Sequence, residues 1–265
     1  MPSTSPVEPH DRPHAMATSD LSSAIDPTAS AFFFDFDGTL AAIADDPRAV
    51  RVEARVIEAL EALRARSGGA LAVVSGRPIQ QLDEMLKPLR LPAAGVHGLE
   101  RRGADGAMFR VEIDMAAVAR IRERVGAFVK GRSGLLMEIK PGSVALHYRK
   151  RPELAAACLD LAAKLADEDR RIRLVRGKRV IEMKLADRTK ADAIAEFMDE
   201  APFAGRRPLF AGDDVTDEDG FEVLSRWRGW TVKIGKGETA AAYRMSDVAT
   251  FHDWLVALAT GGAAA

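Results

Sequence analysis

The feature that most constrains the fold is the segment of residues 31–40, which reads AFFFDFDGTL. Its continuous apolar start, closed by Gly38, is typical of a strand buried on both faces of a sheet. Asp35 and Asp37 follow at a spacing of two, which places both carboxylates on one face of an extended chain. Carboxylates at the end of a buried strand are costly unless a cation, a partner or a substrate compensates them. In open α/β sheets, the carboxyl ends of the strands are the usual ligand site.

Short apolar runs alternate with amphipathic helical patterns along most of the chain. Further strands are expected at residues 70–74, 93–96, 208–211 and 230–234, and helices at residues 51–66, 78–89, 189–200, 217–226 and 251–259. This alternation predicts an α/β fold, with a Rossmann-like parallel sheet and crossover helices.

The pattern changes between residues 107 and 177. Strands are expected there at residues 107–112, 135–140, 143–149 and 171–175, and helices at residues 115–130 and 152–169. The order of these elements resembles the ferredoxin-like βαββαβ arrangement. We therefore expect a small α+β lobe at 107–177, inserted between two halves of a main domain, 31–106 and 178–260. Residues 179–184 are expected to return the chain to that main domain.

The composition excludes several classes of protein. With 265 residues and 47% hydrophobic residues, the chain can bury the core of two lobes. The formal net charge of −1 gives no electrostatic footprint for nucleic acid or an anionic membrane. A single cysteine, Cys158, excludes a disulfide framework and fits a reducing, cytoplasmic location. No apolar run approaches the roughly 20 residues that span a bilayer. The protein is expected to be a monomer.

Both ends of the chain are expected to lie outside the folded part. Residues 1–30 are rich in Pro, Ser, Thr and Asp, which predicts a disordered tail without the apolar region of a secretory signal. Translation could begin at Met1 or at Met16, and both starts stay open. Residues 261–265 are expected to be flexible.

Charged or hydroxyl side chains follow several of the expected strands. They are Asp35, Asp37 and Thr39 after the first strand, Ser75 and Arg77 after the second, and Asp213, Asp214 and Asp217 after the strand at 208–211. Because parallel strands end at one edge of a sheet, these groups can converge. Mg2+ relieves the repulsion among such carboxylates, and Lys190, hydroxyls and helix N-termini can bind an anion beside it. An edge that binds Mg2+ and a dianion together predicts phosphoryl transfer.

The motifs DFDGTL at 35–40, Ser75, Lys190 and GDD at 212–214 together resemble the haloacid dehalogenase-like (HAD) phosphatase superfamily. The match is closer still to the trehalose-6-phosphate phosphatase family. That closer match rests on SGR at 75–77, HGLE at 97–100, ExK at 138–140, LHYR at 146–149 and GDDVTDE at 212–218. The resemblance covers residues 31–258. It implies a HAD core with an inserted cap, and hydrolysis of trehalose 6-phosphate to trehalose and phosphate, the last step of trehalose biosynthesis.

The resemblance also implies a role for each matched residue. Asp35 would be the nucleophile that forms an aspartyl-phosphate, and Asp37 the general acid and then the base. Mg2+ would be held by Asp35, Asp213 and the main-chain carbonyl of Asp37, with Asp214 and Asp217 orienting its water or Lys190. The phosphate contacts would come from Asp35, Asp37, Gly38, Thr39, Ser75, Gly76, Arg77 and Lys190. The sugar contacts would come from His97, Glu138, Lys140, His147, Arg149 and Glu182.

Three alternatives stay open. Lys190 is preceded by LADRT and followed by Ala191, where family members carry proline and glycine, so Lys184 competes for the role of catalytic lysine. The substrate could be another sugar phosphate, such as sucrose or mannosylglycerate phosphate. The chain could also be a non-catalytic sugar-phosphate sensor or a partner of a trehalose-phosphate synthase, although a sensor does not need a nucleophile such as Asp35.

Overall fold

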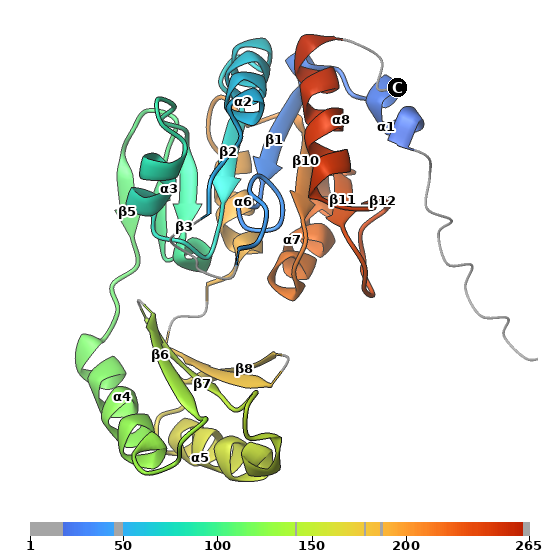
Figure 1. The fold of residues 1–265 in the computed structure, drawn as a ribbon. Helices are drawn as coiled ribbons and strands as arrows, with labels where there is room; N and C mark the ends of the chain where they lie inside the picture. Colours follow the sequence, from blue (N-terminus) through green and yellow to red (C-terminus); the bar gives the residue numbers. More distant parts are fainter. Residues whose placement is uncertain (1–17, 45–49, 141, 178, 186–187, 262–265) are drawn as a thin grey trace, which may run out of the picture. The chain divides into compact units, whose positions relative to one another are not determined.

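The computed structural model describes residues 18–44, 50–140, 142–177, 179–185 and 188–261. These residues form two compact units, which are described in turn (Figure 1). The first unit combines the chain up to residue 71 with the chain from residue 198 onward, and the second comprises residues 72–197. In the described part of the chain, every helix is too short or too polar to cross a membrane.

The first unit is built on four parallel strands in the order β12-β11-β10-β1. The strands are β1 (Ser30–Phe34), β10 (Arg207–Gly212), β11 (Trp230–Ile234) and β12 (Tyr243–Met245). The helices are α1 (Thr18–Ala24), α2 (Ala54–Arg66), α7 (Glu218–Val223) and α8 (Val248–Thr260), with 3-10 turns at Pro27–Ala29, Val215–Asp217 and Leu224–Trp227. Helices α2 and α8 lie side by side (Figure 1).

Strand β1 is buried along its whole length, as its apolar sequence predicts. Phe33 stacks on Phe203 with ring centroids 5.4 Å apart, and Phe34 meets the edge of Phe251 at 5.7 Å. Phe34 pairs in parallel register with Ala211 of β10. Both strands therefore end at the same edge of the sheet. The acidic residues that follow them lie at that edge.

The second unit begins with strands in the order β2-β3-β4-β5, of which β2 and β3 are parallel and the others antiparallel. They are β2 (Leu71–Val74), β3 (Ala93–Gly95), β4 (Glu100–Arg102) and β5 (Met108–Arg110). Helices α3 (Ile79–Met85) and α6 (Lys190–Met198) and a 3-10 turn at Val96–Gly98 accompany them. The parallel strands of both units, with their connecting helices, confirm the predicted α/β class.

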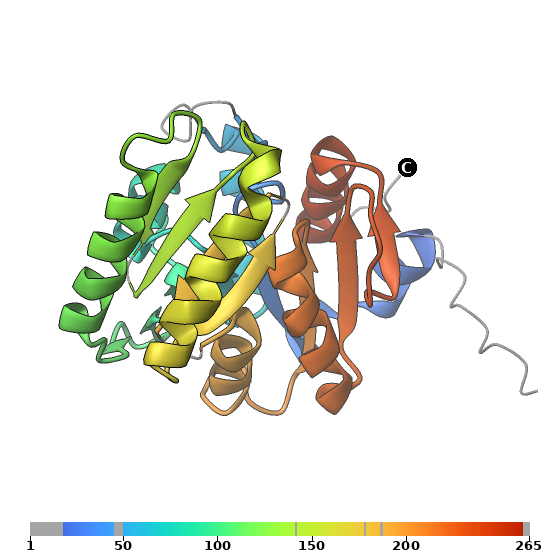
Figure 2. The ribbon, with the colours of Figure 1, turned by 90° about the horizontal axis from the view of Figure 1, so that it is seen from below.

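The rest of the second unit is a four-stranded antiparallel sheet in the order β6-β7-β9-β8. Its strands are β6 (Leu136–Lys140), β7 (Ser143–His147), β8 (Arg173–Gly177) and β9 (Val180–Lys184). Helices α4 (Met115–Val129) and α5 (Ala155–Glu168), the latter preceded by a 3-10 turn at Pro152–Leu154, cover one face (Figure 2). Val125, Cys158 and Ile181 are among the side chains buried between them. Cys158 is therefore a core residue.

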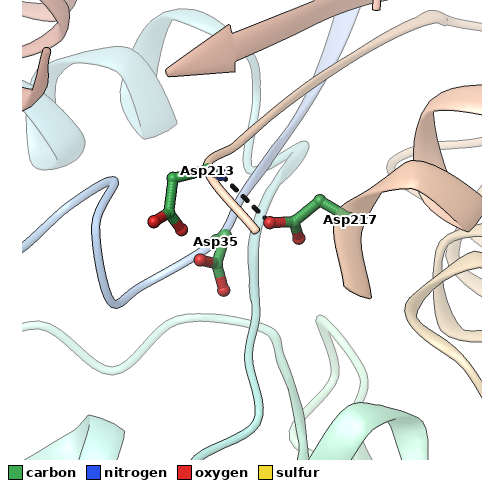
Figure 3. A group of neighbouring side chains, drawn as sticks. All are labelled: Asp35, Asp213 and Asp217. Atoms are coloured by element: carbon green, nitrogen blue, oxygen red, sulfur yellow. Dashed lines mark hydrogen bonds between the residues drawn. The ribbon is translucent and has the colours of Figure 1, made fainter. Parts of the chain in front are cut away.

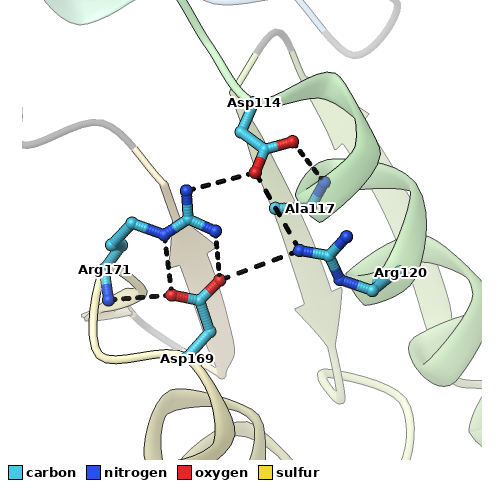
Figure 4. Close-up of polar contacts among 5 residues, drawn as sticks. All are labelled: Asp114, Ala117, Arg120, Asp169 and Arg171. Atoms are coloured by element: carbon cyan, nitrogen blue, oxygen red, sulfur yellow. Dashed lines mark hydrogen bonds and ion pairs between the residues drawn. The ribbon is translucent and has the colours of Figure 1, made fainter.

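An ion-pair network ties the start of α4 to the turn after α5 (Figure 4). Asp114 caps α4 by accepting a hydrogen bond from the Ala117 N–H at 2.9 Å, as its position before the helix predicts. Arg171 donates to Asp114 at 3.1 Å and to Asp169 at 2.7 Å. The hydrogen bonds that Asp169 accepts from the Arg171 side chain and from the Arg171 N–H lower the pKa of Asp169 to about 2. Asp114, Arg120 and Arg171 are exposed and Asp169 is only partly buried, so the network contributes little to stability.

The structure corrects the predicted boundaries of the inserted lobe. Residues 107–112 were expected inside it, but β5 pairs with β4 instead. Residues 179–184 were expected in the main domain, but β9 lies between β7 and β8. The order is therefore helix, hairpin, helix, hairpin rather than βαββαβ. The physical reason is that Ile181 and Met183 bury their side chains under α4 and α5, which requires β9 to pair with β7.

The predicted disordered tail is also shorter than expected. Residues 18–24 form α1, in which Leu21 is buried, and Ile25 directly after it is buried too. Trp254 Nε1 of α8 donates to Ser22 Oγ at 2.9 Å. The prediction of disorder up to residue 30 is therefore wrong for residues 18–30, because this stretch contributes to the core. Residues 1–17 and 262–265, with the alternative start at Met16, lie outside the described residues.

Candidate active site

Three carboxylates gather where β1 and β10 end (Figure 3). Asp35 follows β1, Asp213 follows β10, and Asp217 lies in the 3-10 turn that comes next. One oxygen from each lies within 4.8 Å of the other two, and Asp35 and Asp217 are buried. Carboxylates this close and this buried repel one another unless a cation joins them. The set of oxygen donors suits a hard divalent cation such as Mg2+.

The loop after β10 is closed by its own carboxylates. Asp217 Oδ2 accepts a hydrogen bond from the Asp213 N–H at 3.0 Å (Figure 3). It also accepts one from the Asp214 N–H at 3.0 Å. The Asp214 side chain accepts from the Asp217 N–H in return, which completes a capping box. A Cβ on Gly212 would lie 2.3 Å from Asp217 Cγ. Asp217 therefore stabilises the loop through its hydrogen bonds and is also a member of the acidic group. Asp214 is exposed, and its side chain hydrogen-bonds the backbone.

The turn after Asp35 is equally tight. Gly38 has a φ of +81°, and its N–H donates to the Ala41 carbonyl at 2.7 Å. A Cβ on Gly38 would lie 2.1 Å from Asp213 Oδ2, so only glycine leaves room for that carboxylate. Thr39 Oγ1 is buried without a hydrogen-bond partner among the described residues. A buried hydroxyl of this kind usually has a ligand or water to bond. These observations and the acidic group fit a bound cation and an anionic ligand.

A second group of predicted residues lies in the second unit. Ser75 follows β2, its Oγ accepts from the Arg77 N–H at 3.1 Å, and its carbonyl accepts from the His97 N–H at 3.0 Å. A Cβ on Gly76 would lie 2.7 Å from His97 Nε2, so the imidazole lies directly against Gly76. The backbone of His97 has a φ of +55° and that of Val96 a φ of +51°. Such strain in a β-branched residue is typical of a functional loop.

Three lysines contribute positive charge at His97. Burial, followed by the positive charges of Lys190, Lys184 and Lys140, lowers the pKa of His97 to about 3. Lys190 is buried at the first position of α6, behind a cap in which the Asp192 N–H donates to Thr189 Oγ1 at 3.3 Å. Ammonium groups beside a helix N-terminus favour an anion. Lys184, the competing lysine, donates to the Arg188 carbonyl at 3.3 Å.

The shifted pKa predicts a pH dependence of stability. The usual pKa of 6.5 falls to about 3 on folding, so the unfolded chain binds more protons between these values. The stabilisation is complete above pH 6.5 and is lost as the pH falls toward 3. We therefore expect the difference in unfolding free energy between the wild type and His97→Gln to shrink between pH 7 and pH 4 in urea denaturation. Carboxylate titrations cancel in this difference, and a constant difference would contradict the buried, neutral imidazole.

Four of the predicted sugar contacts share one face of the small sheet, the face opposite α4 and α5. Glu138 and Glu182 lie on either side of Ala145 in the sheet register. His147 Nε2 lies 2.9 Å from Glu138 Oε2, and Lys140 Nζ lies 3.7 Å from Glu182 Oε2. Two predicted contacts lie elsewhere: His97 stands against Gly76, and Arg149 is exposed beyond the end of β7.

Three polar residues of these sites were missed from the sequence. Ser143 donates to Glu182 Oε1 at 2.5 Å. The period of two along β7 places Ser143 on the same face as His147, and this pattern could have predicted its position. Lys233 of β11 donates to the Asp213 carbonyl. His252 of α8 lies with Nε2 3.0 Å from the Thr39 carbonyl. The sequence did not indicate a role for Lys233 or His252, because neither the apolar strand around the lysine nor the helix around the histidine carries a recognisable motif.

Comparison with known proteins agrees with this geometry. Residues 33–249 match the family model described as trehalose-phosphatase. The trehalose-6-phosphate phosphatase of Escherichia coli is 42% identical over 230 residues, which cover 87% of this chain and 86% of that protein.

Solved structures share the fold. The C-terminal domain of Candida albicans trehalose-6-phosphate phosphatase has a TM-score of 0.78 at 19% identity, covering 94% of this chain and 99% of that one. A HAD-superfamily phosphatase from Bacteroides thetaiotaomicron has a TM-score of 0.59 at 13% identity, covering 89% of this chain and 96% of that one. At these identities the two structures support the HAD fold alone. Together with the family model and the bacterial relative, they show that the chain belongs to the trehalose-phosphatase family of HAD-fold hydrolases.

Proposed function

We propose that the protein is a Mg2+-dependent phosphatase that hydrolyses trehalose 6-phosphate to trehalose and phosphate through an aspartyl-phosphate. The observation that carries the proposal is the group of Asp35, Asp213 and Asp217, with ligand oxygens within 4.8 Å of one another. The name of the relative from Escherichia coli supports the substrate. A sugar-phosphate sensor has no use for a buried nucleophile beside an acidic group of this kind.

The proposed reaction begins at Asp35, whose carboxylate attacks phosphorus while the ester oxygen of the sugar leaves. Asp37 gives its proton to that oxygen, which releases the sugar and leaves phosphate on Asp35. Asp37, now a base, takes a proton from water as the water attacks the phosphorus, and Asp35 is regenerated. The same two residues thereby serve both half-reactions.

The bound cation would offset the negative charge of the phosphoryl oxygens. Asp35, Asp213 and the main-chain carbonyl of Asp37 would hold it, with Asp217 fixing the loop that carries Asp213. Gly38, Thr39, Ser75, Gly76, Arg77 and Lys190 are assigned to the phosphoryl group. Lys190 is preferred to Lys184 because it stands at the N-terminus of α6, where a helix favours an anion.

We assign choice of the sugar to the polar face of the small sheet. Glu138, Lys140 and Glu182 lie there with His147, and carboxylate and ammonium groups can bond the hydroxyls of a sugar remote from the phosphate. We propose that β6–β9 with α4 and α5 act as the cap. A disaccharide is long enough to reach both a cap and a catalytic core.

The test is release of phosphate from trehalose 6-phosphate, sucrose 6-phosphate and glucose 6-phosphate, each with Mg2+ and with EDTA. We expect the highest kcat/KM on trehalose 6-phosphate and almost no turnover in EDTA. Activity that survives the chelator would remove the metal from the proposal. A preference for sucrose 6-phosphate would identify the alternative substrate, and absence of turnover on all three would favour the sensor.

Replacement of a cap carboxylate should affect one substrate more than others. Glu138→Ala is expected to lower kcat/KM on trehalose 6-phosphate about tenfold or more, because a hydrogen bond to a charged group is worth roughly 1.5–3 kcal/mol. Turnover of p-nitrophenyl phosphate, which carries no sugar, should change little. Glu123→Ala on α4, which covers the opposite face of the sheet, is the control. An equal loss on both substrates would mean that Glu138 does not contact the sugar.

A further inference from the structure

Lys233 is a buried charged residue that the proposed reaction does not use. It lies in β11, opposite Gly212 of β10, and is 4% exposed. Its Nζ donates to the main-chain carbonyl of Asp213 and lies 3.6 Å from Glu218 Oε1. Burial of an ammonium group in such a strand is costly unless an opposite charge and hydrogen bonds compensate it.

Glu218, the first residue of α7, is itself fixed. Its Oε2 accepts hydrogen bonds from the Ala240 N–H at 2.8 Å and from Thr239 Oγ1 at 3.1 Å. The carboxylate is thus held by the segment between β11 and β12, and its other oxygen faces Lys233. Glu218 therefore balances the charge of Lys233 and anchors its ammonium group.

These contacts hold the backbone of Asp213 from both sides. Its N–H donates to Asp217 Oδ2 at 3.0 Å, and its carbonyl accepts from Lys233. The two peptide groups that flank a residue set the direction of its side chain. The Asp213 carboxylate also has little room to move, since it lies against Gly38.

We propose that Lys233 is a positioning residue for cation binding: through the main chain, it aims the carboxylate of Asp213 at the cation, and Glu218 anchors it. The inference rests on the proposed function in one respect, that Mg2+ is the cation bound by the acidic group. A residue that acted only by its charge would do the opposite, since a nearby ammonium group weakens cation binding. When the pair is removed without a change in net charge, the positioning role therefore predicts weaker Mg2+ binding, and a role by charge alone predicts unchanged or tighter binding.

The experiment compares two double variants of equal net charge. Lys233→Met with Glu218→Gln removes the buried pair, whereas Lys236→Met with Glu222→Gln removes an exposed lysine and an exposed glutamate close by in the chain. Binding of MgCl2 to the substrate-free protein is measured by isothermal titration calorimetry. We expect the buried variant to bind Mg2+ roughly tenfold more weakly, the usual cost of losing a group that orients a metal ligand. The control variant should bind as the wild type does.

Kinetics separate positioning from a general loss of structure. The Mg2+ concentration for half-maximal activity should rise by the same factor, while KM for the sugar phosphate stays unchanged. Circular dichroism checks that the variants are folded. If the buried double variant does not fold, Lys233→Arg replaces it, because a guanidinium keeps the charge but cannot take the place of the compact ammonium group. The same weakening is then expected.

Unchanged or tighter Mg2+ binding in the buried variant would overturn the inference, as would failure of the wild type to bind Mg2+. Because the calorimetry contains no substrate, the proposed function is tested separately. A wild type that binds Mg2+ in a Lys233-dependent way but leaves trehalose 6-phosphate intact would refute the proposed substrate and keep the positioning role.

Discussion

Asp35→Asn is expected to lower kcat by at least roughly 10³-fold, since removal of a nucleophile costs more than removal of any group that assists it. The amide has the same shape as the carboxylate, so the fold should persist. Without metal the variant should even melt at a higher temperature than the wild type, because it removes the charge of a buried carboxylate that lies beside two others. Phosphate release with saturating Mg2+ and thermal unfolding in EDTA measure the two effects.

The matched control is Asp219→Asn, which neutralises an exposed carboxylate of α7. It should leave both kcat and the melting temperature unchanged. Appreciable turnover by Asp35→Asn would assign the nucleophile to another residue. A lower melting temperature in EDTA would mean that the carboxylates do not repel one another in the folded protein.

Gly38→Ala is expected to lower kcat/KM about 100-fold, because displacement of a catalytic group by about 1 Å can cost that much. The new Cβ would lie 2.1 Å from Asp213 Oδ2 and must push the carboxylate away from the cation site. Mg2+ binding to the substrate-free variant should weaken as well. Calorimetry with MgCl2 and phosphate release measure the two consequences.

Gly106→Ala separates steric clash from backbone strain. Gly106 has a φ of +83°, almost that of Gly38, but nothing lies within 4 Å of the position of its Cβ. Both substitutions incur the roughly 1–2 kcal/mol of a left-handed alanine, and only Gly38→Ala meets a carboxylate. Equal effects of the two variants on Mg2+ binding would show that Gly38 is needed for its conformation and not for the space it leaves.

Local pattern was enough to predict strands β1, β2, β3, β10 and β11 and the acidic residues that follow β1 and β10, although it did not predict β12. Residues 31–34 were expected to form a buried strand, since a short apolar run closed by a glycine is typical of a strand covered on both faces, and all of its phenylalanines are buried. The i and i+2 spacing of Asp35 and Asp37, and the two aspartates that follow Gly212 at the end of β10, then indicated a cation site at one edge. These inferences need only the period of a strand and the chemistry of carboxylates.

The sequence-based assignment of β9 failed because pairing depends on distant partners. Residues 179–184 were expected to return the chain to the main domain, and nothing within the segment says which sheet it joins. That choice is made by Ile181 and Met183, which are buried against helices that begin far away in the chain. The residues before β1 were likewise expected to be disordered because of their polar composition. Their contact with α8 joins segments more than 200 residues apart, so local pattern could not predict it.

By itself, the sequence determined that two aspartates end the buried strand of residues 31–34 and that further carboxylates follow a neighbouring strand. Only the tertiary structure decided how those carboxylates are held: Asp217 joins Asp35 and Asp213, Gly38 leaves space for Asp213, and Lys233 fixes its backbone from β11. The physical reason is that a residue type and its spacing follow from local geometry. Burial, pKa and hydrogen-bond partners depend instead on side chains that the chain brings together from distant positions.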